Sequence, residues 1–297
     1  MNNNVKKVLY NYKNFGFWYG TSFLLTKTIF RKFEHITRKH AIKILDKEFG
    51  YIYEEEKKKG KNNNHFEKNI FVFWAQGFDK LPEIPKKSIE NIEKMYPDYK
   101  IHKITLDNFK EYVDIDKNLL NLFENKKISI QTFSDILRYN LLYKYGGIWC
   151  DLTLLFLDRI DFEKKIEKND YYSLNIDCEE KTKLWSKVYP VTYTTFFFAT
   201  KKESPIMKAI NRSYIEYYKK YDFVIDYFLN DYFMILAMQH NLEENTLEKI
   251  EKTEGNPFYL LNKIQKNDRN IDYREIKKCP QKLTWKNITL EGWDVNG

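Results

Sequence analysis

Four side chains that could bind an anionic ligand or a cation lie close together in the sequence, on either side of a double glycine. Asp135 and Arg138 are three positions apart, which places them on neighbouring positions of one helical face. Asp151 and Thr153 are two positions apart, which places both on the same side of a strand. A guanidinium, two carboxylates and a hydroxyl suit a nucleotide diphosphate, because an Arg or a cation held by carboxylate oxygens stabilises phosphate charge.

These residues also have structural interpretations. An exposed ion pair between Asp135 and Arg138 would be common in a helix and weak. Asp151 is different, because it stands in an apolar run where an unpaired carboxylate costs several kcal/mol. The sequence therefore favours a functional role for Asp151 and leaves both roles of the helical pair open.

The surrounding residues predict a helix, a turn and a strand. Apolar residues recur at spacings of three to five over 130–145, which is typical of a helix packed on one face. Gly146 closes this helix, and Gly147 lets the backbone turn or approach a neighbour closely. The segment 148–157 is predicted to be a buried strand with Asp151 inside it.

Other segments predict the fold around this unit. A strand is expected in 69–77, a helix within 81–97 that has Pro85 in its first turn and is closed off by Pro97, and a second strand in 99–106, which is the βαβ order of a parallel sheet. Further helices are predicted over 204–221 and 226–240. We expect an α/β fold with a mixed, mostly parallel sheet.

The net charge of +8 is concentrated at one end of the chain. Residues 1–60 contain thirteen Lys or Arg and six Asp or Glu, and the rest is nearly neutral. A nucleic-acid-binding domain would carry its basic residues across the fold, so this class is excluded. The five His residues have no ligand spacing, and the three Cys residues suggest neither a disulfide framework nor a zinc site, which fits a reducing, cytoplasmic setting.

The basic segment predicts one or two helices over 5–50, followed by a polar linker over 53–69. Its uncharged run 14–26 is shorter than the about 20 residues that cross a membrane, and no signal-peptide cleavage site follows it. We therefore expect a basic, aromatic helical appendage with its linker over 1–65, and a folded domain over 66–297.

Three stretches, "FVFWAQG", "FSDILRYNLLYKYGGIWCDLT" and "YTTFFFATK", resemble the capsular polysaccharide synthesis glycosyltransferases. These belong to the wider GT-A group, with the yeast outer-chain mannosyltransferases and the clostridial glucosylating toxins. The likeness covers roughly 68–290 and is most specific from the helix to Asp151. It implies a GT-A type, Rossmann-like nucleotide-binding domain. It also implies a hexosyltransferase that moves a sugar from a nucleotide diphosphate sugar, a UDP-sugar by preference, to a capsular or other surface polysaccharide with retention at the anomeric carbon.

The resemblance also implies roles for single residues. In the wider group, the helix Asp and Arg contact the sugar nucleotide, and an Asp-x-Asp in the strand binds metal and diphosphate. Asp135 and Arg138 would hold the donor, Arg138 and Asp151 would act in catalysis, and Asp151 with Thr153 would bind Mn²⁺ or Mg²⁺. Thr153 departs from the pattern, because a hydroxyl that adds no charge stands in place of the second acid.

Further donor-binding candidates follow the first strand and lie near the end of the sequence. Trp74 would stack on the nucleobase or pack in the core, and Gln76 and Gly77 lie at the strand's carboxyl end, where ligands bind in open α/β sheets. Gly147 and Lys286, the latter in a tail that resembles the segment closing over the donor, complete the set.

Two more acids, Asp226 and Asp231, are candidates for the acceptor side of the site. They would take part in catalysis there, or else Asp226 caps a helix and Asp231 is solvated.

The implied partners are a nucleotide-sugar donor and a polysaccharide or lipid-linked oligosaccharide acceptor. Residues 1–60 are expected to contact the inner face of a bacterial cell membrane from the cytoplasm, unless these helices pack on the domain or form a dimer contact. A second function stays open: if Thr153 has replaced an essential acid, the protein is a noncatalytic, membrane-attached polysaccharide assembly factor that binds a sugar nucleotide.

Overall fold

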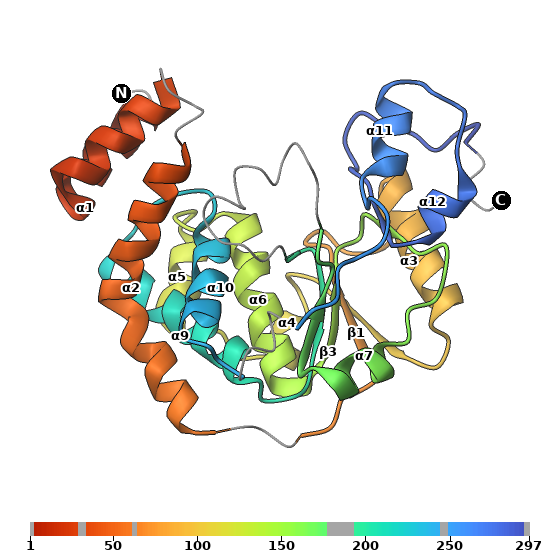
Figure 1. The fold of residues 1–297 in the computed structure, drawn as a ribbon, viewed down its shortest axis with the longest axis horizontal. Helices are drawn as coiled ribbons and strands as arrows, with labels where there is room; N and C mark the ends of the chain where they lie inside the picture. Colours follow the sequence, from red (N-terminus) through yellow and green to blue (C-terminus); the bar gives the residue numbers. More distant parts are fainter. Residues whose placement is uncertain (1–2, 29–33, 61–63, 177–192, 244–248, 294–297) are drawn as a thin grey trace.

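The computed structural model describes residues 3–28, 34–60, 64–176, 193–243 and 249–293 (Figure 1). Its helices are α1 (Asn3–Thr28), α2 (Glu34–Lys58), α3 (Glu83–Met95), α4 (Phe109–Tyr112), α5 (Lys117–Glu124), α6 (Ile130–Tyr145), α7 (Phe162–Lys168), α9 (Pro205–Lys220), α10 (Leu229–Gln239), α11 (Tyr259–Gln265) and α12 (Tyr273–Lys277). Its strands are β1 (Asn69–Phe73), β2 (Lys100–Ile104), β3 (Gly147–Cys150), β4 (Leu154–Leu155), β5 (Tyr171–Ser173), β6 (Phe197–Thr200) and β7 (Gln281–Lys282).

The central sheet has five strands in the order β2-β1-β3-β6-β5. β1 pairs in parallel with both β2 and β3, whereas β6 is antiparallel to both β3 and β5. It follows that β6 alone in this sheet runs against the direction of the other four strands. The predicted α/β fold with a mixed, mostly parallel sheet and helices at the N-terminus is confirmed.

Both faces of this sheet are buried, as Figure 1 shows by the helices on either side of it. Phe71 of β1 packs toward the layer that contains α6, α9, α10 and α2. Its neighbours Ile70 and Val72 pack on the other face, together with residues of α3 and α7. Because successive side chains of β1 point to opposite faces of the sheet, this strand contributes to the hydrophobic core on each face.

The junction between α6 and β3 has the geometry that its two glycines predict. Gly146 has φ +65° and donates its N–H to Leu142 O at 2.9 Å, which closes the helix. Gly147 has φ +105°, and a Cβ there would lie 2.5 Å from the carbonyl oxygen of Asn69 in β1. The second glycine therefore lets β3 approach β1 closely enough to pair with it.

The continuous strand expected over 148–157 is wrong, because β3 ends at Cys150 and a tight turn follows. Thr153 donates its N–H to Asp151 O at 2.7 Å, and the chain resumes as β4. Asp151 therefore stands at the carboxyl end of a strand, where a polar side chain reaches the edge of the sheet instead of its interior.

The linker expected over 53–69 begins later than the sequence indicates, because α2 continues to Lys58. Tyr53 is buried and donates its hydroxyl to Phe233 O of α10 at 3.0 Å. Glu56 is buried as well and accepts a hydrogen bond of 2.7 Å from Arg212 of α9. Tyr53 and Glu56, which the sequence assigns to a solvated linker, therefore hold α2 against α9 and α10.

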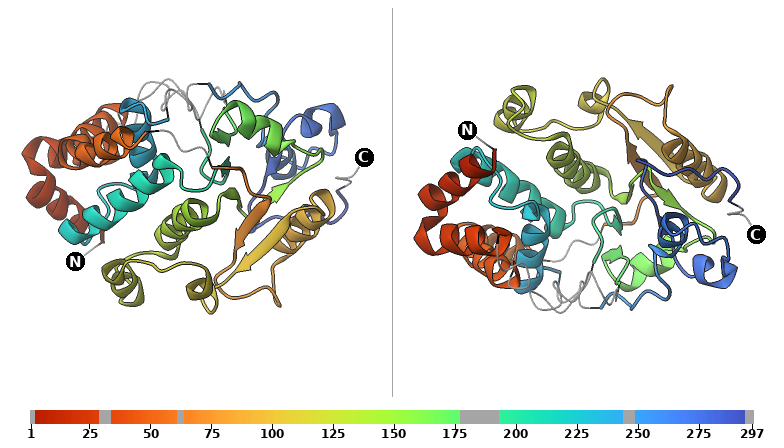
Figure 2. Two further views of the ribbon diagram at one scale, coloured as in Figure 1. Left: turned by 90° about the horizontal axis from the view of Figure 1, so that it is seen from below. Right: turned by 90° about the horizontal axis from the view of Figure 1, so that it is seen from above.

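The N-terminal helices differ in how far they belong to the domain. α2 lies against α9 and α10, whereas α1 lies outside α2 at the edge of the molecule, as both views of Figure 2 show. α1 also contacts the segment before α10: Tyr19 donates its hydroxyl to Ile225 O at 3.4 Å, and the ring centres of Phe15 and Tyr221 are 4.8 Å apart. The alternative that these helices pack on the domain therefore describes α2 and one side of α1. Among the described residues, no helix combines the length and the apolar character that a membrane span requires.

Candidate active site

A cavity of about 1130 Å³ opens at the edge of the sheet where β1 and β3 end and β6 begins. This is the edge at which open α/β sheets bind ligands. Segments far apart in the sequence line it, among them Trp74, Gln76, Asp135, Arg138, Asp151, Thr153, Asp226, Asp231, Lys282 and Trp285. The structure therefore brings most of the candidates from the sequence into one place.

Arg138 lies in the floor of this cavity with its side chain 8% exposed. It donates to Thr195 O, and its guanidinium lies 3.2 Å from Asp135 Oδ1 and 3.7 Å from Asp151 Oδ1. Its guanidinium carbon is 4.9 Å from the centre of the Trp149 ring. The exposed helical ion pair considered from the sequence is therefore a buried one that also reaches Asp151.

Asp151 is held by partners on both of its oxygens. Oδ1 accepts from Trp149 Nε1 at 2.9 Å, and Oδ2 accepts from Lys282 Nζ at 2.8 Å. Burial alone would raise the pKa of Asp151, but the Lys282 and Arg138 charges and these hydrogen bonds hold that pKa below its usual value. Asp151 therefore stays ionised despite its burial.

Two other carboxyl groups in the cavity have pKa values near neutrality. Burial raises the pKa of Asp135 to about 6, against the opposing effect of Arg138. Burial, and then the charge of Asp135, raise the pKa of Asp231 to about 7, and Tyr193 donates its hydroxyl to Asp231 O at 2.8 Å. Carboxyl groups whose environments separate their pKa values are typical of acid and base roles in active sites.

The residues present do not fit the expected Mn²⁺ or Mg²⁺. Mg²⁺ needs near-ideal octahedral oxygen ligands at about 2.0–2.1 Å, and Asp151 and Thr153 supply one carboxylate and one uncharged hydroxyl toward them. The Lys282 ammonium already lies 2.8 Å from Asp151 Oδ2 and 2.6 Å from Thr153 Oγ1, and a second positive charge there would be repelled. Within the described ranges, no group of three or more His, Cys, Asp or Glu could hold a metal. The cofactor stays a prediction.

The remaining candidates divide between the cavity and the scaffold. Trp74 lines the cavity and makes an edge-to-face contact with Trp285, with ring centres 5.6 Å apart. Gly77, Gly147 and Lys286 are not among the described residues that line it. Gly147 serves the approach of β3 to β1 instead.

Asp226 lines the cavity but is not the helix cap that the sequence left open, since α10 begins after Phe228. Its side chain is buried in the loop before α10 and accepts from Phe228 N at 3.3 Å. Asp231 is not fully solvated either, because it lies within the first turn of α10 beside Tyr193.

Lys282 is the site residue that the sequence does not reveal. It is four positions before Lys286 in the same tail, and no spacing rule separates the two lysines. The signal available in the sequence is the tail itself, which resembles the segment that closes over the donor. In the structure the buried Leu283 of this tail donates its N–H to Thr153 O at 2.8 Å. That bond ties the tail to the segment after Asp151.

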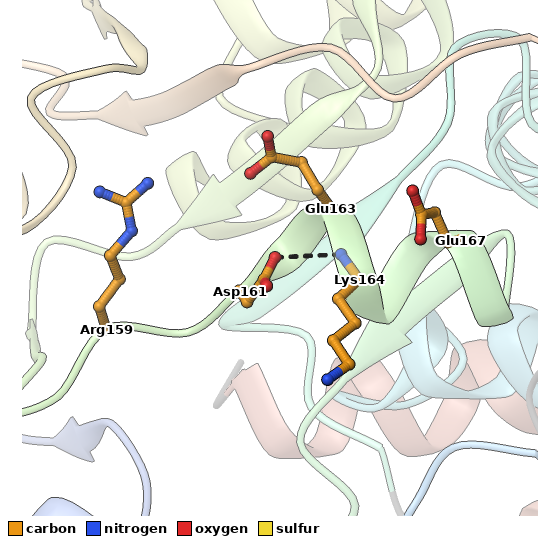
Figure 3. A pocket seen from close by; sticks show the side chains of 5 residues that line it. All are labelled: Arg159, Asp161, Glu163, Lys164 and Glu167. Carbon is orange, nitrogen blue, oxygen red and sulfur yellow. Dashed lines mark hydrogen bonds between the residues drawn. The ribbon is translucent and has the colours of Figure 1, made fainter.

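A second hollow, of about 730 Å³, lies on the surface at the start of α7 (Figure 3). Figure 3 shows its charged side chains spread around the hollow without converging on one point; they are Arg159, Asp161, Glu163, Lys164 and Glu167. Arg159 pairs with Asp98 at 2.8 Å, and Glu163 pairs with Lys68 at 2.6 Å. We assign this hollow no function.

Comparison with known proteins gives a family match and two partial relatives. The family model described as "Capsular polysaccharide synthesis protein" matches residues 22–292. "O-glycosyltransferase braB" of Annulohypoxylon truncatum is 30% identical over 95 residues, which cover 29% of this chain and 22% of that protein. The chain thus matches about a fifth of that relative's length. The solved structure "PaToxG Glycosyltransferase" aligns with 69% of this chain and 78% of its own, with 18% identity and a TM-score of 0.40.

We predict that Arg138→Ala lowers the free energy of unfolding by about 3 kcal/mol or more, because it leaves Asp135 without its counter-charge and Asp151 with Lys282 alone. Arg138→Lys should recover less than half of this loss, since one ammonium does not replace a planar fork that meets several oxygens. Urea denaturation measures both. Arg159→Ala, which breaks an exposed pair, is the matched control and should cost about 1 kcal/mol or less. Equal stability of Arg138→Lys and the wild type would contradict the prediction.

Proposed function

The chain belongs to the capsular polysaccharide synthesis protein family, and we propose that it is a GT-A glycosyltransferase acting from a nucleotide diphosphate sugar. The observation that supports this proposal most is the cavity in which Arg138 and Lys282 lie beside Asp151 while Trp74 and Trp285 meet. Two positive side chains suit a diphosphate and the aromatic pair suits a nucleobase. The name of the relative, an O-glycosyltransferase, is consistent with transfer to a hydroxyl.

In this proposal the donor is a UDP-sugar that carries a hexose. The uracil lies against Trp74 and Trp285, and the diphosphate lies between Arg138 and Lys282. The sugar then extends toward Asp135. The anomeric configuration is retained, as the family resemblance implies.

The acceptor enters over the loop before α10 and is a growing surface polysaccharide, lipid-linked at its far end. Tyr227 is 79% exposed at the cavity and offers a flat aromatic face of the kind that sugars stack on. Asp231 lies next to this loop with a pKa raised to about 7, so it accepts the proton of the acceptor hydroxyl.

Donor turnover tests the proposed function directly. We expect the purified protein to release UDP from at least one UDP-sugar in a panel of UDP and GDP sugars, slowly without an acceptor and faster with lipid-linked oligosaccharide. Binding of a sugar nucleotide by calorimetry without any turnover would instead support the noncatalytic assembly factor. Failure of every nucleotide in the panel to bind would exclude both.

The rate of transfer to acceptor should rise with pH through about 7, because only the ionised form of Asp231 accepts a proton. Asp231→Asn should lower the rate by about a hundredfold and flatten the pH profile. Asp222→Asn, a change at an exposed acid of the same loop, is the control and should keep the wild-type profile. An unchanged profile in Asp231→Asn would remove this residue from the acceptor side.

The protein is proposed to work at the inner face of a bacterial cell membrane, in contact through α1. One side of α1 packs inward through Phe15, Tyr19 and Phe23, whereas its exposed apolar residues are Leu9, Phe17, Trp18, Leu24 and Leu25. α1 is kinked at Gly16 (φ +84°); Lys6 and Lys13 are exposed before the kink, and Phe17, Trp18, Leu24 and Leu25 lie after it. Exposed aromatic and basic residues on adjoining helical segments suit contact with an anionic lipid surface.

Flotation with anionic liposomes tests this contact. The wild type should rise with the vesicles, more weakly in high salt, and the double variant Phe17→Ser, Trp18→Ser should stay at the bottom. Tyr51→Ser, which removes an aromatic ring that is 50% exposed on α2, should float like the wild type. Point variants are used here because a deletion of residues 1–60 would also remove the buried face of α2 and disturb the fold. Equal behaviour of all three proteins would refute the contact.

A further inference from the structure

Lys282 is fixed in the cavity by its own backbone. Its N–H donates to Pro257 O at 2.6 Å, and the next residue, Leu283, donates to Thr153 O at 2.8 Å. β7 also pairs with β4, directly after the turn that contains Asp151 and Thr153. The side chain is 18% exposed, and its ammonium is 4.9 Å from the centre of the Phe196 ring. Little freedom is left to this side chain, so its position opposite Asp151 is built into the fold.

The ammonium occupies the point at which a cation would bind. It lies within 2.8 Å of Asp151 Oδ2 and 2.6 Å of Thr153 Oγ1, the two oxygens that the family resemblance assigns to a metal. Lysine has three N–H donors, and among the described residues these two oxygens are its hydrogen-bond acceptors. A donor therefore remains for a ligand in the cavity.

Arg138 supplies the second positive charge beside Asp151. Arg138 lies on the other oxygen of Asp151, at 3.7 Å. Lys282 and Arg138 together carry the two unit charges that a single divalent ion would supply, and both belong to side chains already in place. Fixed charges of this kind stabilise a leaving group without reorganisation at the moment of reaction.

We propose that Lys282 replaces the divalent cation in this protein, so that the donor diphosphate is bound and released without metal. The inference rests on the proposed function and concerns the same site. The bond between the anomeric carbon and the β-phosphate oxygen breaks, and its electron pair stays on that oxygen, where Lys282 and Arg138 neutralise it. The acceptor oxygen forms the new bond on the face of the anomeric carbon that the diphosphate leaves, which retains the configuration, and it loses its proton to Asp231.

This proposal explains why a threonine, and not a second acid, stands at position 153. A second carboxylate at this position would place an additional negative charge against one ammonium and would favour a divalent ion instead. A hydroxyl holds Lys282 by accepting a hydrogen bond and adds no charge. In this proposal, Thr153 in place of the second acid and Lys282 in place of the divalent cation belong together.

Calorimetry with UDP and GDP, in EDTA and again in excess Mn²⁺, tests the proposal. The wild type should bind the preferred nucleotide equally in both solutions. Lys282→Met should weaken that binding by at least about tenfold in EDTA, while Lys282→Arg should retain most of it. Lys277→Met, at an exposed lysine of α12, is the matched control and should bind like the wild type. Thermal unfolding of each variant separates loss of binding from loss of fold.

A variant that restores a metal site provides a second measurement. Lys282→Met combined with Thr153→Asp removes the ammonium and supplies the missing acid, so Mn²⁺ should bind to it by electron paramagnetic resonance while the wild type leaves the ion free. Wild-type binding of UDP that requires Mn²⁺, or Lys282→Met that binds like the wild type, would overturn the role of Lys282 and leave the proposed function standing. Failure of the wild type to bind UDP or GDP in either solution would overturn both.

Discussion

The ionised carboxylate of Asp151 is the constraint on which the site depends. It stands at the end of an apolar strand, where an unpaired charge is costly, and it is compensated by Arg138 from α6 and Lys282 from β7. Each partner explains a piece of architecture. The helix that carries Arg138 must turn back and pack against β3, which the double glycine allows, and the tail must return across the fold to place β7 beside β4.

The helical layer gives the cavity its second wall. α10 and the loop before it carry Asp226 and Asp231, and α2 packs against α10 from outside. His240, at the end of α10, lies 2.6 Å from Asp46 Oδ1 of α2, which joins the two helices through charged groups. The two N-terminal helices thus differ: α2 supports the wall of the cavity, whereas α1 packs on α2 and on the loop before α10 with one side and leaves aromatic residues exposed on the other.

Local patterns in the sequence predict those structural features that are determined by residues close together in the chain. The periodicity of 130–145, the glycine pair and the βαβ order all correspond to observed elements, because helix ends, turns and strand pairing follow from nearby residues. The turn after Asp151 escapes prediction, since apolar residues on both sides continue the pattern of a strand. Lys282 escapes it for another reason: its role arises from a tertiary contact 131 positions away, and a lysine in isolation reads as solvated.

The distance of Lys282 from Asp151 along the chain has a consequence for how the protein is made. A chain leaves the ribosome from its N-terminus, and its earlier parts begin to fold first. Arg138, in the helix immediately before β3, is available to Asp151 as soon as that unit forms, whereas Lys282 follows Asp151 by 131 residues. The nascent sheet can therefore carry its buried acid with one counter-charge. The cluster of Asp151, Arg138 and Lys282 becomes complete only when β7 has been synthesised and has paired with β4.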